Sequence, residues 1–185
     1  MGRNGKVDYS GILAIRDEIE KNLSGQELQN FIDSCAKELA ARLLAKVVKR
    51  TPVGNYHGEE YTCTKADTGR KHTSVEIPGK KGGTLRKGWT AGKNQSTSAY
   101  AQEIKVHHTG SSYVIEIVNP VEYASYVEYG HKQTPGRYVP LLGKSLKKGW
   151  VEGHFMLTIS EKEIQRDAPK ILENKLKKKL GEIFN

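Results

Sequence analysis

One apolar series constrains the fold of this chain more than any other feature. Apolar side chains recur every three or four positions, the spacing of one face of an α-helix, at Leu28, Ile32, Cys35, Leu39, Leu43 and Val47. Ser24 and Glu27 precede them in the arrangement of a capping box. Thr51-Pro52 follows them, and a proline lacks an amide donor and disfavours helical angles at the residue before it. The pattern predicts a long amphipathic helix over about 25–50.

A second long helix is expected at the C-terminal end. Apolar residues fall at helical spacing at Phe155, Ile159, Ile164, Ala168, Ile171, Leu172, Leu176, Leu180 and Phe184. Pro169 should interrupt or kink this helix. For residues 1–24 we expect a loose arm that carries a short helix, because a polar, glycine-containing start is followed by a short apolar series.

The middle of the chain carries strand patterns. Leu85 to Thr90 is a short strand candidate, and Tyr100, Ile104 and Val106 alternate with polar neighbours before a predicted turn at 107–110. Residues 113–118 alternate in the same way and should form the hairpin partner, which ends at Asn119-Pro120. Together these segments predict a small antiparallel sheet of three to four strands.

A short helix and a loop should connect this sheet to the terminal helix. Tyr123, Tyr126 and Val127 fall at helical spacing, and Gly130 could end that helix as a left-handed cap. Residues 131–149 contain prolines and glycines and are predicted to be a loop. Strands grouped between helices favour an α+β fold, and we expect residues 25–185 to form one domain.

Composition restricts the class of protein. The chain has 185 residues, of which 36% are hydrophobic and 28% charged, so it is too apolar for a disordered polymer. No segment approaches the roughly 18 apolar residues of a membrane helix, and the N-terminus lacks the apolar core of a signal peptide. We therefore expect a soluble protein made in the cytoplasm, with Cys35 and Cys63 as free thiols.

Basic charge is concentrated in one non-periodic segment. The formal net charge is +9, and residues 65–93 hold eight basic side chains against two acidic ones. A loop at 54–83 should expose part of this charge, with DNA-contact candidates at Arg70, Lys71, Lys80 and Lys81. The alternative is a solvated surface loop. The lysines of 175–179 have the simpler explanation that positive charge complements the end of a helix.

No pattern of catalytic or ligand-binding residues stands out. Gly143-Lys144-Ser145 lacks the earlier glycine of a phosphate loop, and the spacing of His57, Cys63 and His72 matches none of the common zinc patterns. There is no Gly-x-Ser-x-Gly nucleophile motif. We expect a non-enzyme that holds no metal and no cofactor.

Two ordered motifs carry a resemblance to a known family. Gly83-Thr-Leu-Arg-Lys-Gly-Trp89 is followed some 35 residues later by Tyr123-Ala-Ser-Tyr-Val-Glu-Tyr-Gly130, and here the chain resembles tailed-phage proteins described as tail components or minor neck proteins. Upstream, the helix that ends in Lys49-Arg-Thr-Pro-Val53 is similar to the family's first helix. Downstream, 149–157 and 159–163 are similar to its closing helix. The resemblance covers most of 25–184.

This resemblance implies a structural virion protein that joins or completes head and tail. It implies no catalysis, a ring of identical subunits around the DNA channel, and contacts with connector or head-completion proteins and with tail-terminator or tail-tube proteins. A ring requires two different faces that match head to tail. The motifs supply the candidates for subunit-interface residues: Leu85, Arg86, Trp89, Tyr123, Tyr126, Glu128 and Tyr129. The alternative is that these large aromatic residues belong to the protein core, where they are equally common.

One departure from the family leaves a second hypothesis open. The family joins Thr-Pro-Val to Leu-Arg by a short link, whereas about thirty residues, 54–83, intervene in this chain. Their role cannot be inherited from the family, and a subunit contact, a contact with genomic double-stranded DNA or a flexible elaboration all fit. The second hypothesis is therefore a stand-alone basic module that binds double-stranded DNA.

Overall fold

The computed structural model describes residues 25–56, 60–62, 71–73, 81–110, 112–140 and 143–184. In chain order, the elements are α2 (Gly25–Arg50), β1 (Glu60–Thr62), β2 (Lys71–Thr73), α3 (Thr84–Gly88), α4 (Thr97–Glu103), β3 (His107–Thr109), β4 (Ser112–Val114), α5 (Ala124–Tyr129), β5 (Gly130–Lys132), β6 (Tyr138–Val139), β7 (Lys144–Ser145), β8 (Trp150–Glu152) and α6 (Met156–Phe184). The α+β prediction is confirmed. The short helix expected in 1–24 and most of the 54–83 loop lie outside the described residues.

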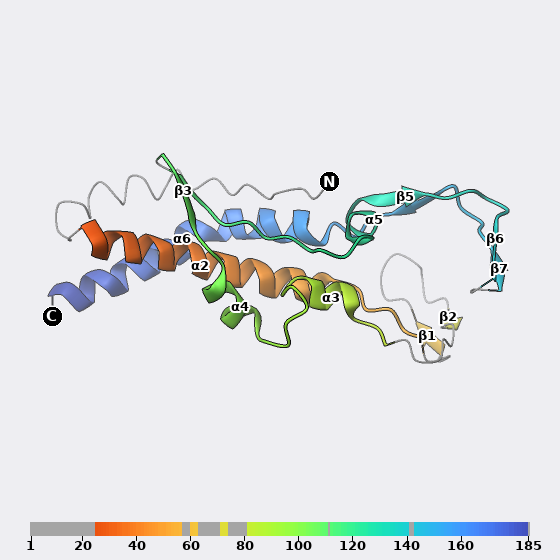
Figure 1. Ribbon diagram of the computed structural model, residues 1–185, viewed down its shortest axis with the longest axis horizontal. Helices are drawn as coiled ribbons and strands as arrows, with labels where there is room; N and C mark the ends of the chain where they lie inside the picture. Colours follow the sequence, from red (N-terminus) through yellow and green to blue (C-terminus); the bar gives the residue numbers. More distant parts are fainter. Residues whose placement is uncertain are drawn as a thin grey trace.

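Two long helices, α2 and α6, form the frame of the molecule. They lie side by side and run in opposite directions (Figure 1). The predicted bounds of the first helix are confirmed, and its predicted apolar face is buried. Ile164, Ala168 and Leu172 of α6 belong to the same hydrophobic core. Burial of these two stripes, rather than helix propensity alone, holds such helices together.

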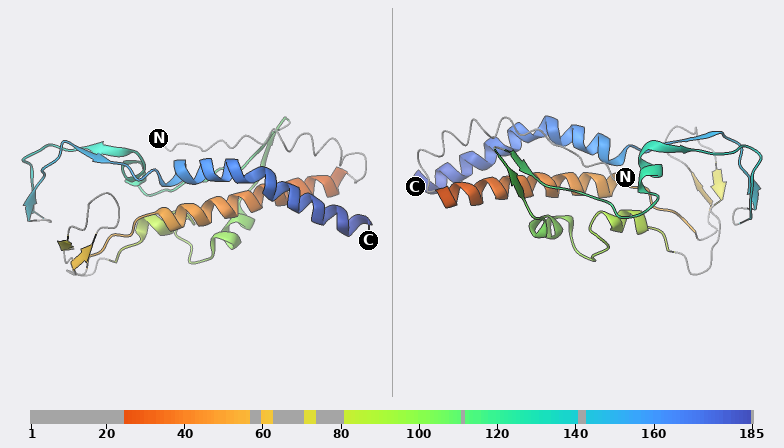
Figure 2. Two further views of the ribbon diagram at one scale, coloured as in Figure 1. Left: turned by 180° about the vertical axis from the view of Figure 1, so that it is seen from behind. Right: turned by 45° about the horizontal axis from the view of Figure 1, so that its top comes forward.

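The terminal helix is continuous through its proline. Pro169 lies inside α6, so the helix is not interrupted there, and Figure 2 shows its two halves running in different directions. A proline inside a helix removes one backbone hydrogen bond and pushes the preceding turn aside, which accounts for a bend. The bend was predicted, and the buried residues on both sides of Pro169 keep the helix against α2.

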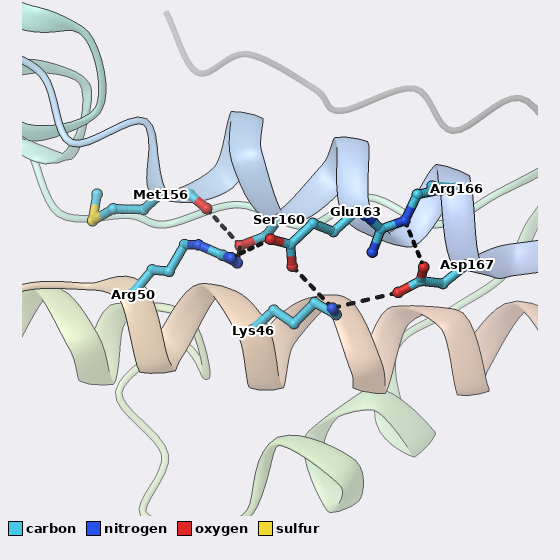
Figure 3. Close-up of polar contacts among 7 residues, drawn as sticks. All are labelled: Lys46, Arg50, Met156, Ser160, Glu163, Arg166 and Asp167. Carbon is cyan, nitrogen blue, oxygen red and sulfur yellow. Dashed lines mark hydrogen bonds and ion pairs between the residues drawn. The ribbon is translucent and has the colours of Figure 1, made fainter.

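A polar network ties the facing sides of α2 and α6 together (Figure 3). The Nζ of Lys46 lies 2.9 Å from Glu163 and 3.6 Å from Asp167, and Arg50 pairs with Glu163. Arg50 also donates to the hydroxyl of Ser160 at 3.0 Å. Hydrogen bonding by Lys46, together with the neighbouring Arg50, lowers the pKa of the Glu163 carboxyl. The network fixes which turn of α6 faces the last turns of α2.

Two strand predictions in the middle of the chain are wrong. Residues Leu85 to Thr90 were expected to be extended, but Thr84–Gly88 is the helix α3. Tyr100 was expected in a strand and lies in α4, whose first turn is capped by Ser96: the serine hydroxyl accepts from the amide of Ala99 at 3.1 Å. Ala101 of α4 is fully buried in the core. Local capping and docking on the helical frame therefore override the alternating pattern.

The strands form separate ladders instead of one sheet. Four antiparallel two-stranded ladders pair β1 with β2, β3 with β4, β5 with β8 and β6 with β7. The predicted hairpin is present and antiparallel, but its strands differ from the predicted ones. Residues 107–109, predicted as part of the turn, form β3 and pair with β4 at 112–114, whereas 115–118 of the predicted partner form no strand. Residues 131–149 were predicted to be a loop and instead contain strands of two ladders. Gly130 ends α5 with φ 84° and ψ 176°, a positive-φ but extended conformation rather than the expected left-handed cap.

Candidate assembly interface

The motif around Trp89 packs onto the exit of α2. Thr51 is fully buried, and its hydroxyl donates to the carbonyl of Val47 at 2.7 Å while accepting from the indole Nε1 of Trp89 at 2.7 Å. The guanidinium of Arg86 donates to the carbonyl of Thr51 at 2.7 Å. The threonine before the proline thus anchors α3 against the frame through its side chain and its backbone.

A second set of contacts holds the other side of α3. The amide of Asn119 donates to the carbonyl of Leu85 at 2.8 Å. A side chain at Gly88 would place its Cβ only 2.2 Å from Asn119 Oδ1, so the glycine is required for this close approach. Leu85 and Trp89 are each only 4% exposed. These two interface candidates therefore lie in the core of the single chain, and Arg86 is partly buried beside them.

Glu128 caps α6 from a different element. Its side chain is buried, and its two carboxylate oxygens accept from the amides of Leu157 and Thr158, each at 2.9 Å. The hydroxyl of Thr158 donates to the same carboxylate at 2.8 Å. These amides have no partner inside the helix, and the negative charge complements the positive end of the helix dipole. This interface candidate therefore joins α5 to α6 within one chain.

The tyrosines of the second motif do reach the surface. Tyr123, Tyr126 and Tyr129 are 45%, 58% and 36% exposed. Of the three, Tyr129 lines a pocket of about 240 Å³, whose lining also includes Trp89, Ile117, Val121, Glu122 and Leu157. We call residues 115–129, which supply most of this lining, the pocket segment. Of the seven predicted interface residues, these three tyrosines are the accessible ones.

An extended arm continues from the pocket segment. We call residues 130–152 the arm; its root is the β5–β8 ladder and its outer part is the β6–β7 ladder (Figure 1). Tyr138 and Trp150 on it are 59% and 52% exposed. No function was predicted for the arm, because its prolines and glycines indicated a loop. The sequence feature that could have indicated a contact surface here is a pair of aromatic residues close to several lysines.

Most of the predicted DNA-contact residues lie outside the part of the chain that the structure describes. Arg70, Lys80 and the side chain of Lys71 lie outside the described residues, although the backbone of Lys71 pairs with Thr62 in the β1–β2 ladder. Lys81 is exposed. These positions stay predictions.

Side chains that could form a chemical site are few among the described residues. Within them, no group of three histidine, cysteine or acidic residues could hold a metal ion, and no helix is long and apolar enough to cross a membrane. Burial raises the pKa of the Cys35 thiol to about 11, which keeps it protonated and unreactive near neutral pH. Lys144 and Ser145, considered above as part of a phosphate loop, pair in the β6–β7 ladder and do not open a helix.

Comparison with known proteins identifies the chain. Residues 14–130 match the HK97-gp10-like family, described as "Bacteriophage HK97-gp10, putative tail-component". No curated protein and no solved structure gives a significant match. The matched span includes α2, the α3 motif and the tyrosine motif, and it ends where the arm begins. The chain belongs to the HK97-gp10-like family of bacteriophage tail components.

Proposed function

We propose that the chain is a non-catalytic subunit that self-associates into a ring at the head-to-tail junction of a tailed phage. Membership of a phage tail-component family supports the structural role. The observation that carries the self-association is the set of three exposed tyrosines on one short segment, Tyr123, Tyr126 and Tyr129, of which Tyr129 lines the pocket. Exposed aromatic side chains are common anchors of protein contacts.

The framework suits such a role because it is held rigidly behind this surface. Trp89 bonds the α3 motif to Thr51 at the exit of α2, and Glu128 bonds α5 to the start of α6. A surface that must match its neighbours repeatedly benefits from such preorganisation, since less order is lost on binding. As partners we propose connector or head-completion proteins on one side and tail-terminator or tail-tube proteins on the other, with genomic DNA in the channel.

A phage whose copy of this gene is interrupted tests the junction role. We expect cells to accumulate filled heads and separate tails, with few joined virions in electron micrographs, and a plasmid copy of the gene to restore joining. Normal virion numbers from the interrupted phage would contradict the proposal. Heads that remain empty of DNA would place the protein at an earlier step and would also contradict it.

A stand-alone DNA-binding module is the second candidate, favoured by the net charge of +9. It predicts duplex binding that weakens steeply with salt, and that is abolished by charge reversal at Arg70, Lys71, Lys80 and Lys81. A gel-shift titration of the full chain at two salt concentrations separates it from the ring proposal. Salt-sensitive binding by a protein that stays monomeric would favour the module.

A further inference from the structure

The arm is an element without sufficient support in a single chain. Two-stranded ladders are marginally stable alone, and the outer β6–β7 ladder lies at one end of the molecule, beyond the β5–β8 root (Figures 1 and 2). Large aromatic side chains on it, Tyr138 and Trp150, remain more than half exposed. An element that exposes this much aromatic surface is typical of one that is completed by a partner.

The charges of the arm and of the pocket segment are complementary. The arm carries Lys132, Arg137, Lys144, Lys147 and Lys148 against the single acidic residue Glu152, a balance of +4. The pocket segment contains no lysine, arginine or histidine. Its acidic residues Glu116 and Glu122 are exposed, and Glu122 lines the pocket. Opposite charges on two surfaces of one chain favour contact between copies of that chain.

The pocket is large enough for an aromatic ring. Its volume is about 240 Å³, and an apolar protein cavity of about 150 Å³ holds benzene. Ile117, Val121 and Leu157 provide apolar lining, while Glu122 provides a negative group at the same site. An aromatic side chain with lysines beside it would match this lining, because the ring can contact the apolar residues while the lysines lie near the carboxylate.

The arm extends from α5 away from the α2–α6 helix pair (Figure 1). A Cβ at Gly130 would lie 2.3 Å from the carbonyl oxygen of Val151, and one at Gly153 would lie 2.2 Å from that of Glu128. These close backbone approaches, with the hydrogen bond from the amide of His154 to the carbonyl of Val127 at 2.8 Å, fix the root of the arm against α5. The arm therefore leaves the body in one direction, and folding back would break this root.

We propose that the arm of one subunit docks on the pocket segment of a second copy, with Trp150 entering the pocket. This inference rests on the proposed self-association and names the surfaces that perform it. Because the arm and the pocket are different surfaces, each copy offers both, and the contact repeats head to tail until a ring closes. The family match ends at residue 130, where the arm begins.

A charge exchange between two variants tests the contact. The arm variant carries Lys144→Glu, Lys147→Glu and Lys148→Glu, and the pocket variant carries Glu116→Lys and Glu122→Lys; all five residues are exposed. Each variant alone should be monomeric by light scattering at concentrations where the wild-type chain is multimeric. An equimolar mixture should recover a multimer, because the acidic arm of one variant then faces the basic pocket of the other. A control matched to the arm variant carries Lys105→Glu, Lys170→Glu and Lys178→Glu, three exchanges of the same kind at exposed positions elsewhere. It should keep the wild-type mass.

Trp150 reports the site of contact directly. It is 52% exposed, whereas Trp89, the other tryptophan, is 4% exposed. As protein concentration rises and multimers form, wild-type emission should shift to the blue. The Trp150→Phe variant should show a much smaller shift, because the remaining Trp89, although it lines the pocket, is already buried in the single chain. Circular dichroism melts show whether each variant folds before its mass is interpreted.

The outcomes separate this inference from the proposed function. If the wild-type chain forms a multimer and either charge variant does so alone, or if the mixture stays monomeric, arm docking is overturned while ring formation stands. A multimer without a tryptophan shift has the same meaning. If the Trp150 shift requires added duplex DNA, the arm is a nucleic-acid surface and the inference fails. A wild-type chain that stays monomeric at every concentration overturns both.

Discussion

Thr51 is the residue at which the exit of α2 is joined to the α3 motif. Its hydroxyl bridges the carbonyl of Val47 and the indole of Trp89, each at 2.7 Å, and its carbonyl accepts from Arg86. All of these groups are buried or partly buried, so each bond that is lost leaves a polar atom away from water. The threonine of the Thr-Pro-Val exit is thereby explained by its bonding and not only by the end of a helix.

Replacing Trp89 with Phe should destabilise the fold. The change removes the Nε1 donor and leaves a small gap beside Thr51, and the loss of such a buried contact costs about 1–3 kcal/mol. The free energy of unfolding from urea titration measures this. Trp150→Phe is the matched control, because Trp150 is exposed and substitutions at exposed sites change stability by about 0.5 kcal/mol or less. Equal effects of the two changes would contradict the role assigned to Trp89.

Glu128→Gln should weaken the start of α6. Glutamine keeps one acceptor oxygen but loses the negative charge that faces the amides of Leu157 and Thr158, so we expect a loss of about 1–2 kcal/mol in unfolding free energy. Glu122→Gln at an exposed position is the control. Hydrogen exchange of the amides at 157 and 158 should rise in the Glu128 variant alone. Unchanged protection there would show that the carboxylate is not the cap.

At the scale of elements, the α2–α6 pair depends on charge. Glu163 bonds to Lys46 and Arg50, and the bonding of Lys46 is the largest cause of the lowered pKa of Glu163. Hydrogen bonding by Arg42 lowers the pKa of Glu38, which also contacts Lys175 of α6 at 3.1 Å. A carboxyl group whose pKa is lower in the folded protein stabilises the fold above its unfolded pKa. That stabilisation is lost as the pH falls through the folded value.

We therefore expect stability to fall as the pH drops below about 4, the usual range of a glutamate pKa. The Glu163→Gln variant should be less stable than the wild-type chain at neutral pH, and the difference should vanish in acid, where both side chains are neutral. Thermal melts across the pH range measure this. Glu161→Gln, an exchange on the same helix, is the control. If the difference in stability between the two proteins persists in acid, packing and not charge is responsible for it.

The long helices could be predicted from sequence, and the short elements could not. An apolar stripe from Leu28 to Val47, with the sequence of a capping box before it and Thr-Pro after it, leaves little choice for the 26-residue helix α2. The five residues of α3 are too few for periodicity to distinguish helix from strand, and their conformation is decided by the contacts of Trp89 and Leu85. In the arm, Pro135 and Gly136 indicated a loop, although pairing between distant segments makes strands there.

The candidate site was predictable to the same limited degree. The tyrosine motif was singled out, and three of its members are exposed as an interface requires. The same reasoning could not separate them from Leu85, Trp89 and Glu128, which are buried, because residue type does not reveal which side of a short helix faces the core. The pocket is formed by segments that are distant in sequence, so no local sequence pattern predicts it.

At the scale of the whole molecule, the shape suits the proposed assembly with further copies of the chain. An antiparallel helix pair supports α3, α4 and α5 on one frame, and the arm leaves that frame at one end (Figure 1). The basic arm and the acidic pocket segment give one chain two unlike surfaces. Such a chain can build a closed ring from identical copies, which is the role proposed at the phage head-to-tail junction.

The mass of the purified full chain in solution tests this claim most directly. We would measure it by light scattering over a range of concentrations, at low and high salt, with and without duplex DNA. The account predicts a defined multimer whose mass does not depend on DNA and which dissociates more readily at high salt, because screening weakens charge contacts. A chain that remains monomeric at all concentrations, or that gains mass only by salt-sensitive binding to the duplex, would contradict it.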